Sequence, residues 1–326
     1  MKFLVHLGLL VAVGAIFFPL NAEALTVSPV RLEITGDPGA TVKGELFLFN
    51  EQESTKTFYS SFENFEPSGD SGTPYFIGAQ DGLATWLQTD SQIILESGER
   101  ITMPFSITIP QGAEPGGYFA AIFWGSQPPS QDGGVSIGGK IGVLILLRVS
   151  GEIEESGGLL NFNGKDKQKF FNSLPVTFEY RLNNTGGDRV VPLGEIKIKN
   201  TFRFTSATLL ANKNEGSVLP GSARKFSVVW ENETPKSTEE NTESGFFSTA
   251  WNQLRDFHFG WYTANLSLVW GKTSQTAQAA YNFFVIPWQL LVLAAAILIF
   301  LWFTGRIFLR KYNRRIIEQA LRNQQQ

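Results

Sequence analysis

Few residues in this chain are suited to catalysis or to binding a metal ion. The chain has no cysteine and two histidines, His6 and His258. Because His6 lies in a segment that we expect to be cleaved, Ser-His-Asp or Cys-His chemistry would depend on His258 alone, and structural zinc sites lack ligands. His258 stands between two phenylalanines, as packed or surface residues do. No carboxylate pair of the glycosidase kind stands out either, so we predict no enzyme, no cofactor and no metal.

Three stretches rich in Gly, Pro, Ser or Glu interrupt the apolar pattern, at residues 67–85, 125–139 and 232–245. Loops carry binding residues more often than the elements they connect. The aspartates of the first stretch lack the alternating spacing of a calcium loop, so solvated turns are the alternative interpretation. The third stretch is predicted to be a disordered tip. The candidate binding residues of the first two stretches are Asp70, Tyr75, Phe76, Asp81, Gln127 and Asp132.

Each end of the chain carries an apolar segment. Residues 1–24 begin with Lys2, continue through an apolar run and end in Ala22-Glu23-Ala24, which is the pattern of a secretory signal peptide. Residues 285–303 are nineteen consecutive uncharged residues, enough to cross a bilayer as a helix. An uncleaved anchor is the alternative for the first segment, and a buried core helix is the alternative for the second.

The residues around the second segment predict its orientation. The tail, residues 304–326, contains six basic residues and one acid, Glu318. Positive charge stays in the cytosol, so we predict a single-pass protein of the cell membrane with its N-terminal part outside and its C-terminus cytoplasmic. Aromatic residues near the two ends of the segment fit the two membrane surfaces. The predicted membrane-contacting residues are Trp288, Trp302, Arg306, Arg310, Lys311, Arg314 and Arg315.

The part between the two apolar segments is acidic. Residues 25–284 contain 20 basic and 28 acidic residues, a net charge near −8. This charge repels nucleic acid, which we exclude as a partner. Although cysteine is absent, about 260 residues are enough for one or two hydrophobic cores without disulfides.

The same part has the pattern of an all-β protein. Short runs rich in Val, Ile, Phe, Tyr and Thr alternate with clusters of Gly, Asn, Asp and Ser. Residues 118–124 and 140–149 are strongly apolar, as central strands are. We predict two tandem immunoglobulin-like β-sandwiches, residues 25–153 and 154–284, followed by a single transmembrane helix.

The two predicted sandwiches share short features in the same order. Duplication of one sandwich accounts for this order, and chance similarity of β-rich sequences is the alternative. The paired features are Phe47–Asn50 with Phe178–Asn183, Leu95–Arg100 with Leu219–Arg224, and Gly117–Ala121 with Gly260–Ala264.

An aromatic stretch, residues 246–261, precedes the last predicted strands. Phe247, Trp251 and Leu254 fall at helical spacing, which predicts a short amphipathic helix. Its aromatic face would rest on the outer leaflet or on a partner, or else cover an open end of the second sandwich. Burial of Trp251 against the sandwich would exclude the membrane.

The first predicted sandwich contains an ordered set of motifs, namely Val27–Leu32, Asp37–Gly39, Leu48–Asn50, Trp86-Leu87, Leu95–Glu99, Ile109-Pro110 and Pro115–Ala121. Together these motifs resemble the N-terminal domain of the WxL-interacting protein family of bacterial cell-surface proteins. The resemblance implies a first domain that binds peptidoglycan and a second that engages WxL surface proteins or a host ligand. A looser similarity links the first domain to periplasmic pilus chaperones, in which a basic residue of the opening strand anchors a client's carboxylate. Arg31 is the candidate for that role, and an ordinary exposed arginine of a strand is the alternative.

Two functional hypotheses follow. The first is a membrane-anchored extracellular binding or scaffold protein that attaches to peptidoglycan or to surface proteins. The second is a chaperone or assembly factor that lends a strand edge to an exported client. The second hypothesis requires an exposed apolar edge strand in the first sandwich, and a capped or charged edge would exclude it.

Overall fold

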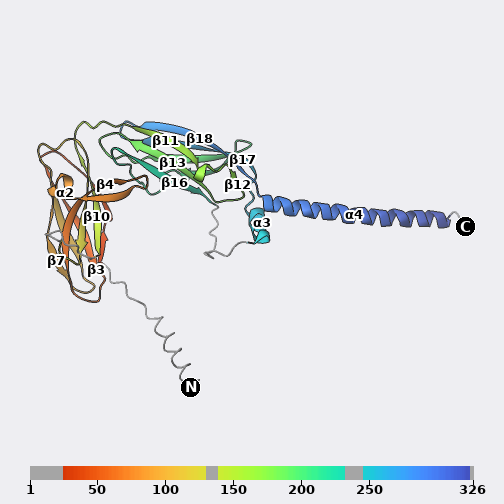
Figure 1. Cartoon of the computed structure of the whole chain (residues 1–326), viewed down its shortest axis with the longest axis horizontal. Coiled ribbons are helices and arrows are strands. Elements are labelled where there is room, and N and C mark those ends of the chain that lie inside the picture. Colours follow the sequence, from red (N-terminus) through yellow and green to blue (C-terminus); the bar gives the residue numbers. More distant parts are fainter. Residues whose placement is uncertain (1–24, 130–138, 232–244, 324–326) are drawn as a thin grey trace, which may run out of the picture. The chain divides into compact units, whose positions relative to one another are not determined.

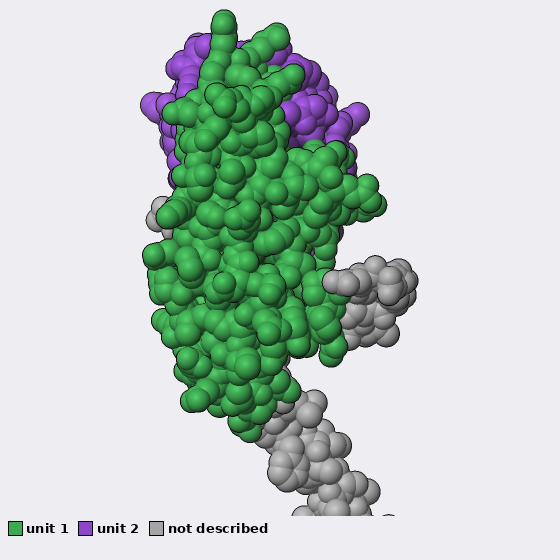
Figure 2. All heavy atoms as spheres, turned by 90° about the vertical axis from the view of Figure 1, so that its left-hand side faces the viewer, with its two compact units in different colours: residues 1–68, 73–154, 186–188 green, residues 69–72, 155–185, 189–326 purple. Residues whose placement is uncertain are grey.

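The computed structural model describes residues 25–129, 139–231 and 245–323, and Figure 1 traces the elements in these ranges. The predicted signal peptide, Asp132 and most of the predicted tip at 232–245 lie outside them. The chain divides into two compact units, which Figure 2 shows in different colours. Unit 1 contains residues up to Ser68, Thr73–Glu154 and Gly186–Asp188. Unit 2 contains Gly69–Gly72, Glu155–Thr185 and the residues from Arg189 onward.

Unit 1 is a sandwich of two sheets. One sheet has the order β1-β3-β8-β6, and the other has the order β2-β10-β9-β4-β5, with β7 also paired to β4. One short helix, α2 (Gly82–Trp86), lies before β6. The strands are β1 (Leu25–Ser28), β2 (Arg31–Gly36), β3 (Thr41–Asn50), β4 (Lys56–Ser68), β5 (Thr73–Gly78), β6 (Leu87–Thr89), β7 (Gln92–Leu95), β8 (Arg100–Thr108), β9 (Gly116–Gly125) and β10 (Lys140–Val149).

The core of unit 1 follows from the alternation along its strands. Successive side chains of a strand point to opposite faces, so every second residue enters the core. On β10 these residues are Val143, Ile145, Leu147 and Val149, which all pack into one cluster with Trp124 of β9. Trp124 is fully buried.

Unit 2 is a second sandwich. Its sheets have the orders β11-β13-β16 and β12-β18-β17-β14-β15. The all-β, immunoglobulin-like prediction is therefore confirmed. The strands are β11 (Gly157–Gly164), β12 (Phe170–Phe171), β13 (Val176–Asn184), β14 (Leu193–Asn200), β15 (Thr205–Leu210), β16 (Ser222–Trp230), β17 (Gly260–Trp270) and β18 (Gln275–Val285).

Aromatic rings form the centre of unit 2. The Tyr180 ring stacks on Phe226 with 4.8 Å between ring centroids, and Phe283 packs against Phe178 at 5.4 Å. Burial raises the pKa of Tyr180 well above its usual value, an effect that the nearby Arg224 opposes. Burial likewise raises the pKa of Tyr281, whose hydroxyl donates to the Gln168 carbonyl at 2.7 Å.

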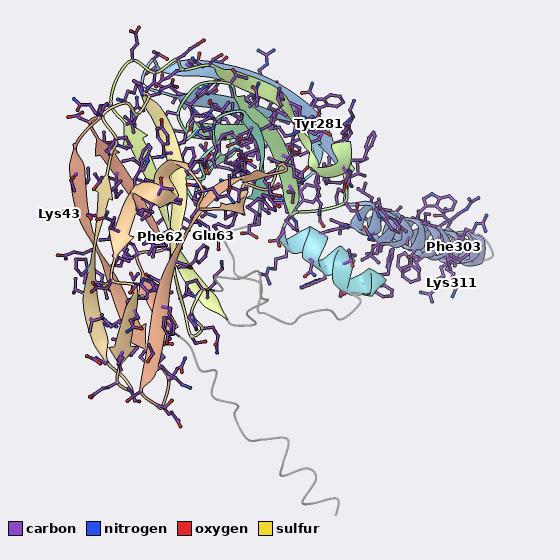
Figure 3. All side chains as sticks on the ribbon, turned by 60° about the vertical axis from the view of Figure 1, so that its left-hand side comes forward. Lys43, Phe62, Glu63, Tyr281, Phe303 and Lys311 are labelled. Atoms are coloured by element: carbon purple, nitrogen blue, oxygen red, sulfur yellow. The ribbon has the colours of Figure 1, made fainter. Side chains whose placement is uncertain are left out.

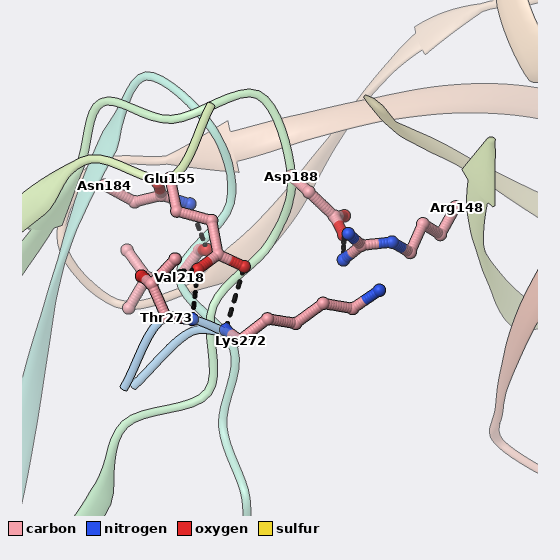
Figure 4. A network of polar contacts seen from close by, with 7 residues as sticks. All are labelled: Arg148, Glu155, Asn184, Asp188, Val218, Lys272 and Thr273. Atoms are coloured by element: carbon pink, nitrogen blue, oxygen red, sulfur yellow. Dashed lines mark hydrogen bonds and ion pairs between the residues drawn. The ribbon is translucent and has the colours of Figure 1, made fainter. Parts of the chain in front are cut away.

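Polar contacts fix the connecting segments of both units (Figure 4). In unit 2, the Glu155 carboxylate accepts hydrogen bonds from the backbone N–H groups of Lys272 and Thr273, each at 2.9 Å. In unit 1, the Arg148 guanidinium pairs with the Asp188 carboxylate. Both pairs join residues far apart in the sequence, so they hold loops that the strand ladders alone do not fix.

Two helices complete unit 2, namely α3 (Phe246–Arg255) and α4 (Trp288–Asn323). The prediction of a helix around Trp251 is confirmed. The predicted membrane segment begins at Val285, but Val285 is the last residue of β18 and is fully buried, so the helix starts three residues later. The helix starts later because Val285 still pairs with Gly260 of β17, and the first helical hydrogen bond is accepted by the Pro287 carbonyl.

Candidate functional site

The edge of the larger sheet of unit 1 is only partly covered. β10 has ten residues, but β2 pairs with it only from Leu144 to Val149. On its other side β10 pairs with β9 along its whole length. Among the described strands, none pairs with Lys140–Val143 on the β2 side. This open edge of β10 is the candidate site.

The alternation of the ladder identifies the backbone groups that are open there. Leu144 N–H donates to the Val30 carbonyl at 3.0 Å, so the backbone of Leu144 points toward β2. Residues two and four positions earlier point the same way, since backbone groups alternate along a strand. The open edge therefore presents the N–H and C=O groups of Gly142 and Lys140. These groups could pair with one further extended strand.

The side chains along the open edge are apolar except for one neutralised cation. Lys140 forms an ion pair with Glu63 of β4, and its ammonium nitrogen lies 4.2 Å from the centroid of the Phe123 ring. Glu63 is among the residues that Figure 3 labels. Ile141 has the same alternation as the core-facing residues that begin at Val143, but it is 39% exposed. The edge thus combines unpaired backbone with a partly exposed aliphatic side chain.

Arg31 lies where the covered part of the edge begins. It is the first residue of β2 and is the register partner of Leu144. Its Nε lies 3.4 Å from the Glu33 carboxylate, and both side chains are well exposed. An exposed pair of this kind contributes little to stability, so the guanidinium can exchange this partner for an incoming carboxylate. Val30, which precedes Arg31, is 74% exposed.

Four other strands at the sheet edges of unit 1 are poorer templates. β1, β6 and β7 have three or four residues each. β5 is uncharged, with Tyr75 62% exposed and Ile77 47% exposed, but it contains Pro74, which has no N–H to donate. Short strands and edge prolines are common protections against unwanted pairing. The open edge of β10 is also four residues long, Lys140–Val143, but it contains no proline and continues a ten-residue strand.

Tyr75 and Phe76 were predicted to lie in a binding loop, and the structure instead places them on β5. Thr73–Gly78 form a strand that pairs antiparallel with β4, so most of the predicted loop is a β-hairpin. The two side chains lie on opposite faces of the strand, because they are neighbours in it. Phe76 packs edge-on against Phe123 with 4.9 Å between ring centroids. Its ring therefore belongs to a packed cluster.

The other predicted loop residues are not gathered into one site. Asp70 belongs to unit 2, where its carboxylate accepts a hydrogen bond from Arg181 at 2.7 Å. The Asp81 carbonyl accepts a bond from the Asn64 side chain at 2.7 Å, just before α2. Gln127 is exposed after β9, and Asp132 lies outside the described residues. The binding roles of these residues stay predictions without a common geometry.

His258 packs against an aromatic side chain. Its ring makes an edge-on contact with Trp230 at 5.2 Å, and its Nδ1 lies 3.1 Å from the Asp256 carbonyl. In the described ranges, no group of three or more His, Cys, Asp or Glu side chains is placed to hold a metal ion.

The predicted membrane-contacting residues all lie on α4. The span Trp288–Asn313 contains an 18-residue window with a mean hydropathy of 2.3, so this helix is long and apolar enough to cross a membrane. Trp288 and Trp302 are exposed, and the Arg306 guanidinium lies 5.3 Å from the Trp302 ring. Figure 3 labels Phe303 and Lys311 on this helix. Arg310, Lys311 and Arg315 are also exposed, whereas the side chain of Arg314 is outside the described part.

Sequence inspection singled out Arg31 but missed the edge beside it. Residues 140–149 were predicted to form a central strand, and the structure places this strand beside a shorter edge strand that leaves part of it bare. The sequence signal for the open edge lies at the start of residues 140–149, where Lys140 and Gly142 precede an unbroken series of apolar residues.

Comparison with known proteins gives a loose structural likeness. No family model and no curated protein matches the chain. The chain is similar to the class 5 fimbriae chaperone CfaA, with a TM-score of 0.38 and 10% identity over 79% of this chain and 99% of that chain. It is also similar to the E. coli chaperone DraB, with a TM-score of 0.33 and 10% identity over 80% and 97% of the two chains.

A third similar structure is the complex of the chaperone CsuC with the tip subunit CsuE of Acinetobacter baumannii, with a TM-score of 0.35 and 11% identity over 79% and 98% of the chains. Likeness at this level does not identify a function. The resemblance to the WxL-interacting proteins finds no support in any family model, so it stays a prediction.

Proposed function

We propose that this protein is a membrane-anchored assembly factor of the bacterial cell envelope, which holds an extended segment of an exported partner protein along the open edge of β10. The observation that carries the proposal is the unequal length of two neighbouring strands. β2 covers six of the ten residues of β10, and no other described strand pairs with the backbone of Lys140 and Gly142 on that side. Addition of a strand at such an edge is a common way to bind an extended peptide.

The geometry favours a defined direction for the bound segment. β2 runs parallel to β10, so a segment that continues the line of β2 over Lys140–Val143 would take the same direction. Its last residue would then lie against Val30 and Arg31. In this direction a C-terminal carboxylate meets the Arg31 guanidinium, which can replace its exposed contact with Glu33 by a charge-assisted hydrogen bond.

The anchor is α4. Its apolar part is long enough to span a bilayer, and five of the described positions between Arg306 and Arg315 are basic. Because basic residues stay in the cytosol, both sandwiches face the outside of the membrane. The protein would thereby hold a newly exported chain close to the surface on which that chain emerges.

Attachment to peptidoglycan or to finished surface proteins is the other hypothesis from the sequence. No loop cluster in the described residues favours a glycan ligand over a peptide, since the candidate loop residues are dispersed. The open edge therefore favours the assembly function, and peptidoglycan binding stays a prediction.

The test is site-specific crosslinking in intact cells that make the full chain. A photoreactive amino acid replaces Ile141 beside the open edge or, as a control, Lys43, an exposed residue of β3 in the opposite sheet that Figure 3 labels. We expect a protein crosslink from position 141 and none of the same mass from position 43, with a lower yield in Arg31→Ala. Equal products from both positions, or glycan products alone, would overturn the proposal.

A further inference from the structure

The end of unit 2 from which α4 leaves is defined by strand register. Asn200, the last residue of β14, pairs with Tyr262 near the start of β17. Gly260, the first residue of β17, pairs with Val285 at the end of β18, and Val285 also pairs with Phe171 of β12. These four strand termini therefore lie together. Only two residues separate Val285 from α4, so this is the end that faces the proposed bilayer.

Exposed aromatic side chains gather at this end. Unit 2 has nine exposed aromatic residues in its described part before α4, and all nine belong to the segments that meet here. The exposed apolar residues elsewhere in this part of unit 2, such as Leu193 and Leu210, are aliphatic. We name the nine residues the aromatic collar: Phe170, Phe202, Phe204, Phe246, Phe247, Trp251, Phe257, Phe259 and Trp261.

The collar comes from three separate stretches of sequence. Phe170 is part of β12. Phe202 and Phe204 stand in or beside the turn from β14 to β15, and they are 77% and 70% exposed. The Thr201 hydroxyl in this turn lies 3.1 Å from both the carbonyl and the amide nitrogen of Trp261, which ties the turn to the start of β17. The remaining rings come from α3 and the residues that follow it.

The orientation of α3 is the reverse of that of a helix on a water-soluble surface. Ala250 and the polar Gln253 are buried, whereas Trp251 and Phe247 are 68% and 73% exposed. In water this arrangement leaves large apolar surfaces hydrated while burying an amide, and extended patches of this kind mark contact surfaces. Burial of Trp251, which would have excluded the membrane, is not observed.

α3 is fixed to the first turn of α4, so its exposed face is continuous with the membrane-spanning surface. The Phe246 and Trp288 rings contact each other edge-on at 5.9 Å, and Gln253 bonds to Gln289 and Leu290. Figure 1 shows α3 beside the start of α4. Aromatic rings prefer the headgroup region of a bilayer, where an apolar body and a polar edge are both accommodated.

We infer that the aromatic collar inserts into the outer headgroup region of the lipid bilayer around the entry point of α4. The inference rests on the proposed membrane anchoring. The occupant of this surface is lipid, because the collar adjoins α4 and is presented by three stretches of sequence at one end of the unit. Side chains of such an interfacial surface enter about 5–10 Å into the boundary between headgroups and acyl chains. Unit 2 thereby rests directly on the membrane.

The absence of native cysteine permits a direct measurement of depth. The full chain carries one spin label, introduced through Phe202→Cys, Trp251→Cys or Phe259→Cys, in phosphatidylcholine vesicles that contain no other protein. The control is Leu193→Cys, which is 53% exposed and begins β14, seven residues and about 23 Å from Asn200. A fifth label, Leu298→Cys, reports on α4 itself.

Collisions of each label with oxygen, which partitions into lipid, and with a water-soluble nickel complex give the depth. We expect the three collar labels to be reached by oxygen more and by nickel less than the Leu193 label, at a depth near the headgroups. If the collar labels behave like the Leu193 label while the Leu298 label lies in lipid, the collar inference is wrong and the anchor stands. If the Leu298 label is also in water, the anchor is wrong as well.

Discussion

Gln253 of α3 is bonded to α4 through both ends of its side-chain amide. Its Nε2 donates to the Oε1 of Gln289 at 2.6 Å, and its Oε1 accepts the backbone N–H of Leu290 at 3.0 Å. The side chain is 1% exposed. A buried amide with both groups satisfied fixes the rotation of its helix, because any other rotation would leave these groups unpaired. These two hydrogen bonds therefore determine which face of α3 is turned outward.

Removal of this amide should release α3. We expect Gln253→Ala to weaken the docking of α3 by about 1–3 kcal/mol, since the partly buried Leu290 N–H loses its partner. Amide hydrogen exchange over Phe246–Arg255, measured on the full chain in detergent, should accelerate by about tenfold for each 1.4 kcal/mol. The neighbouring exposed Asn252→Ala is the matched control. Equal exchange in both variants would show that Gln253 does not hold the helix.

Lys140 offers a test that separates backbone from side chain at the open edge. Proline is tolerated at the first residue of a strand, so Lys140→Pro should keep the fold while removing one N–H that points away from β9. Lys140→Ala removes the same ion pair with Glu63 but keeps the N–H. We expect the crosslinking yield of the Ile141 probe to fall about two- to tenfold in the proline variant relative to the alanine variant. Equal yields would argue against strand addition.

Asn50 should be a stability determinant of unit 1. The Nδ2 of its buried side chain, which carries two N–H donors, lies 3.0 to 3.1 Å from the carbonyl oxygens of Ser54, Leu95 and Glu96. We expect Asn50→Ala to lower the free energy of unfolding of unit 1 by about 1–3 kcal/mol, because one buried and two partly buried carbonyls lose their donor. Thermal unfolding followed by tryptophan fluorescence would measure the change, with the exposed Asn161→Ala of β11 as the control. An unchanged unfolding transition of unit 1 would contradict this role.

Unit 2 should lose stability in alkali. Burial raises the pKa of Tyr180, Tyr262 and Tyr281, whereas in unit 1 the same effect, with a contribution from Glu114, raises the pKa of Tyr118. Above about pH 10 the unfolded chain loses its tyrosine protons while the folded chain keeps them. The free energy of unfolding therefore falls as the pH rises.

Tyr180→Phe tests the alkaline effect. The variant loses the hydrogen bond to the Ala211 carbonyl, at a cost of about 1 kcal/mol at pH 8, but it should decline less steeply than the parent above pH 10. Urea unfolding at pH 8, 9, 10 and 11 gives the two slopes. The exposed Tyr75→Phe should keep the parental slope. If the free energy of unfolding of Tyr180→Phe fell with pH as steeply as that of the parent, Tyr180 would not be the source of the alkaline effect.

The repeated pattern shows how far sequence comparison reaches. The two sandwiches were predicted from alternating runs, and both are present because alternation directly reports which face of a strand is buried. The predicted match of Asn50 with Asn183 is shifted by one residue. Asn184 ends β13 as Asn50 ends β3, and its side chain donates to the Val218 carbonyl at 2.9 Å, ahead of the turn into β16 (Figure 4). A shift of one residue moves each side chain to the opposite face of its strand. The strand pairing seen in the structure, rather than the sequence, reveals this shift.

The open edge and the collar show what sequence comparison does not reach. The alternation of β10 is the same whether its edge is covered or bare, and coverage depends on how far β2, more than a hundred residues away, runs beside it. Phe202 and Phe170 lie far from Trp251 in the sequence, and their common location follows from the pairing of β14, β17, β18 and β12. Helical spacing identified α3, but spacing alone could not decide which face would be buried.

The link between β18 and α4 has a mechanical consequence. It consists of Ile286 and Pro287, and the Ile286 N–H donates to the Phe171 carbonyl at 2.8 Å, so the link has little freedom to bend. A helix longer than the local hydrocarbon thickness tilts to fit it. Such a tilt would be passed to the second sandwich as a lean of the same angle, and bilayer thickness would then set the inclination at which that sandwich stands on the cell.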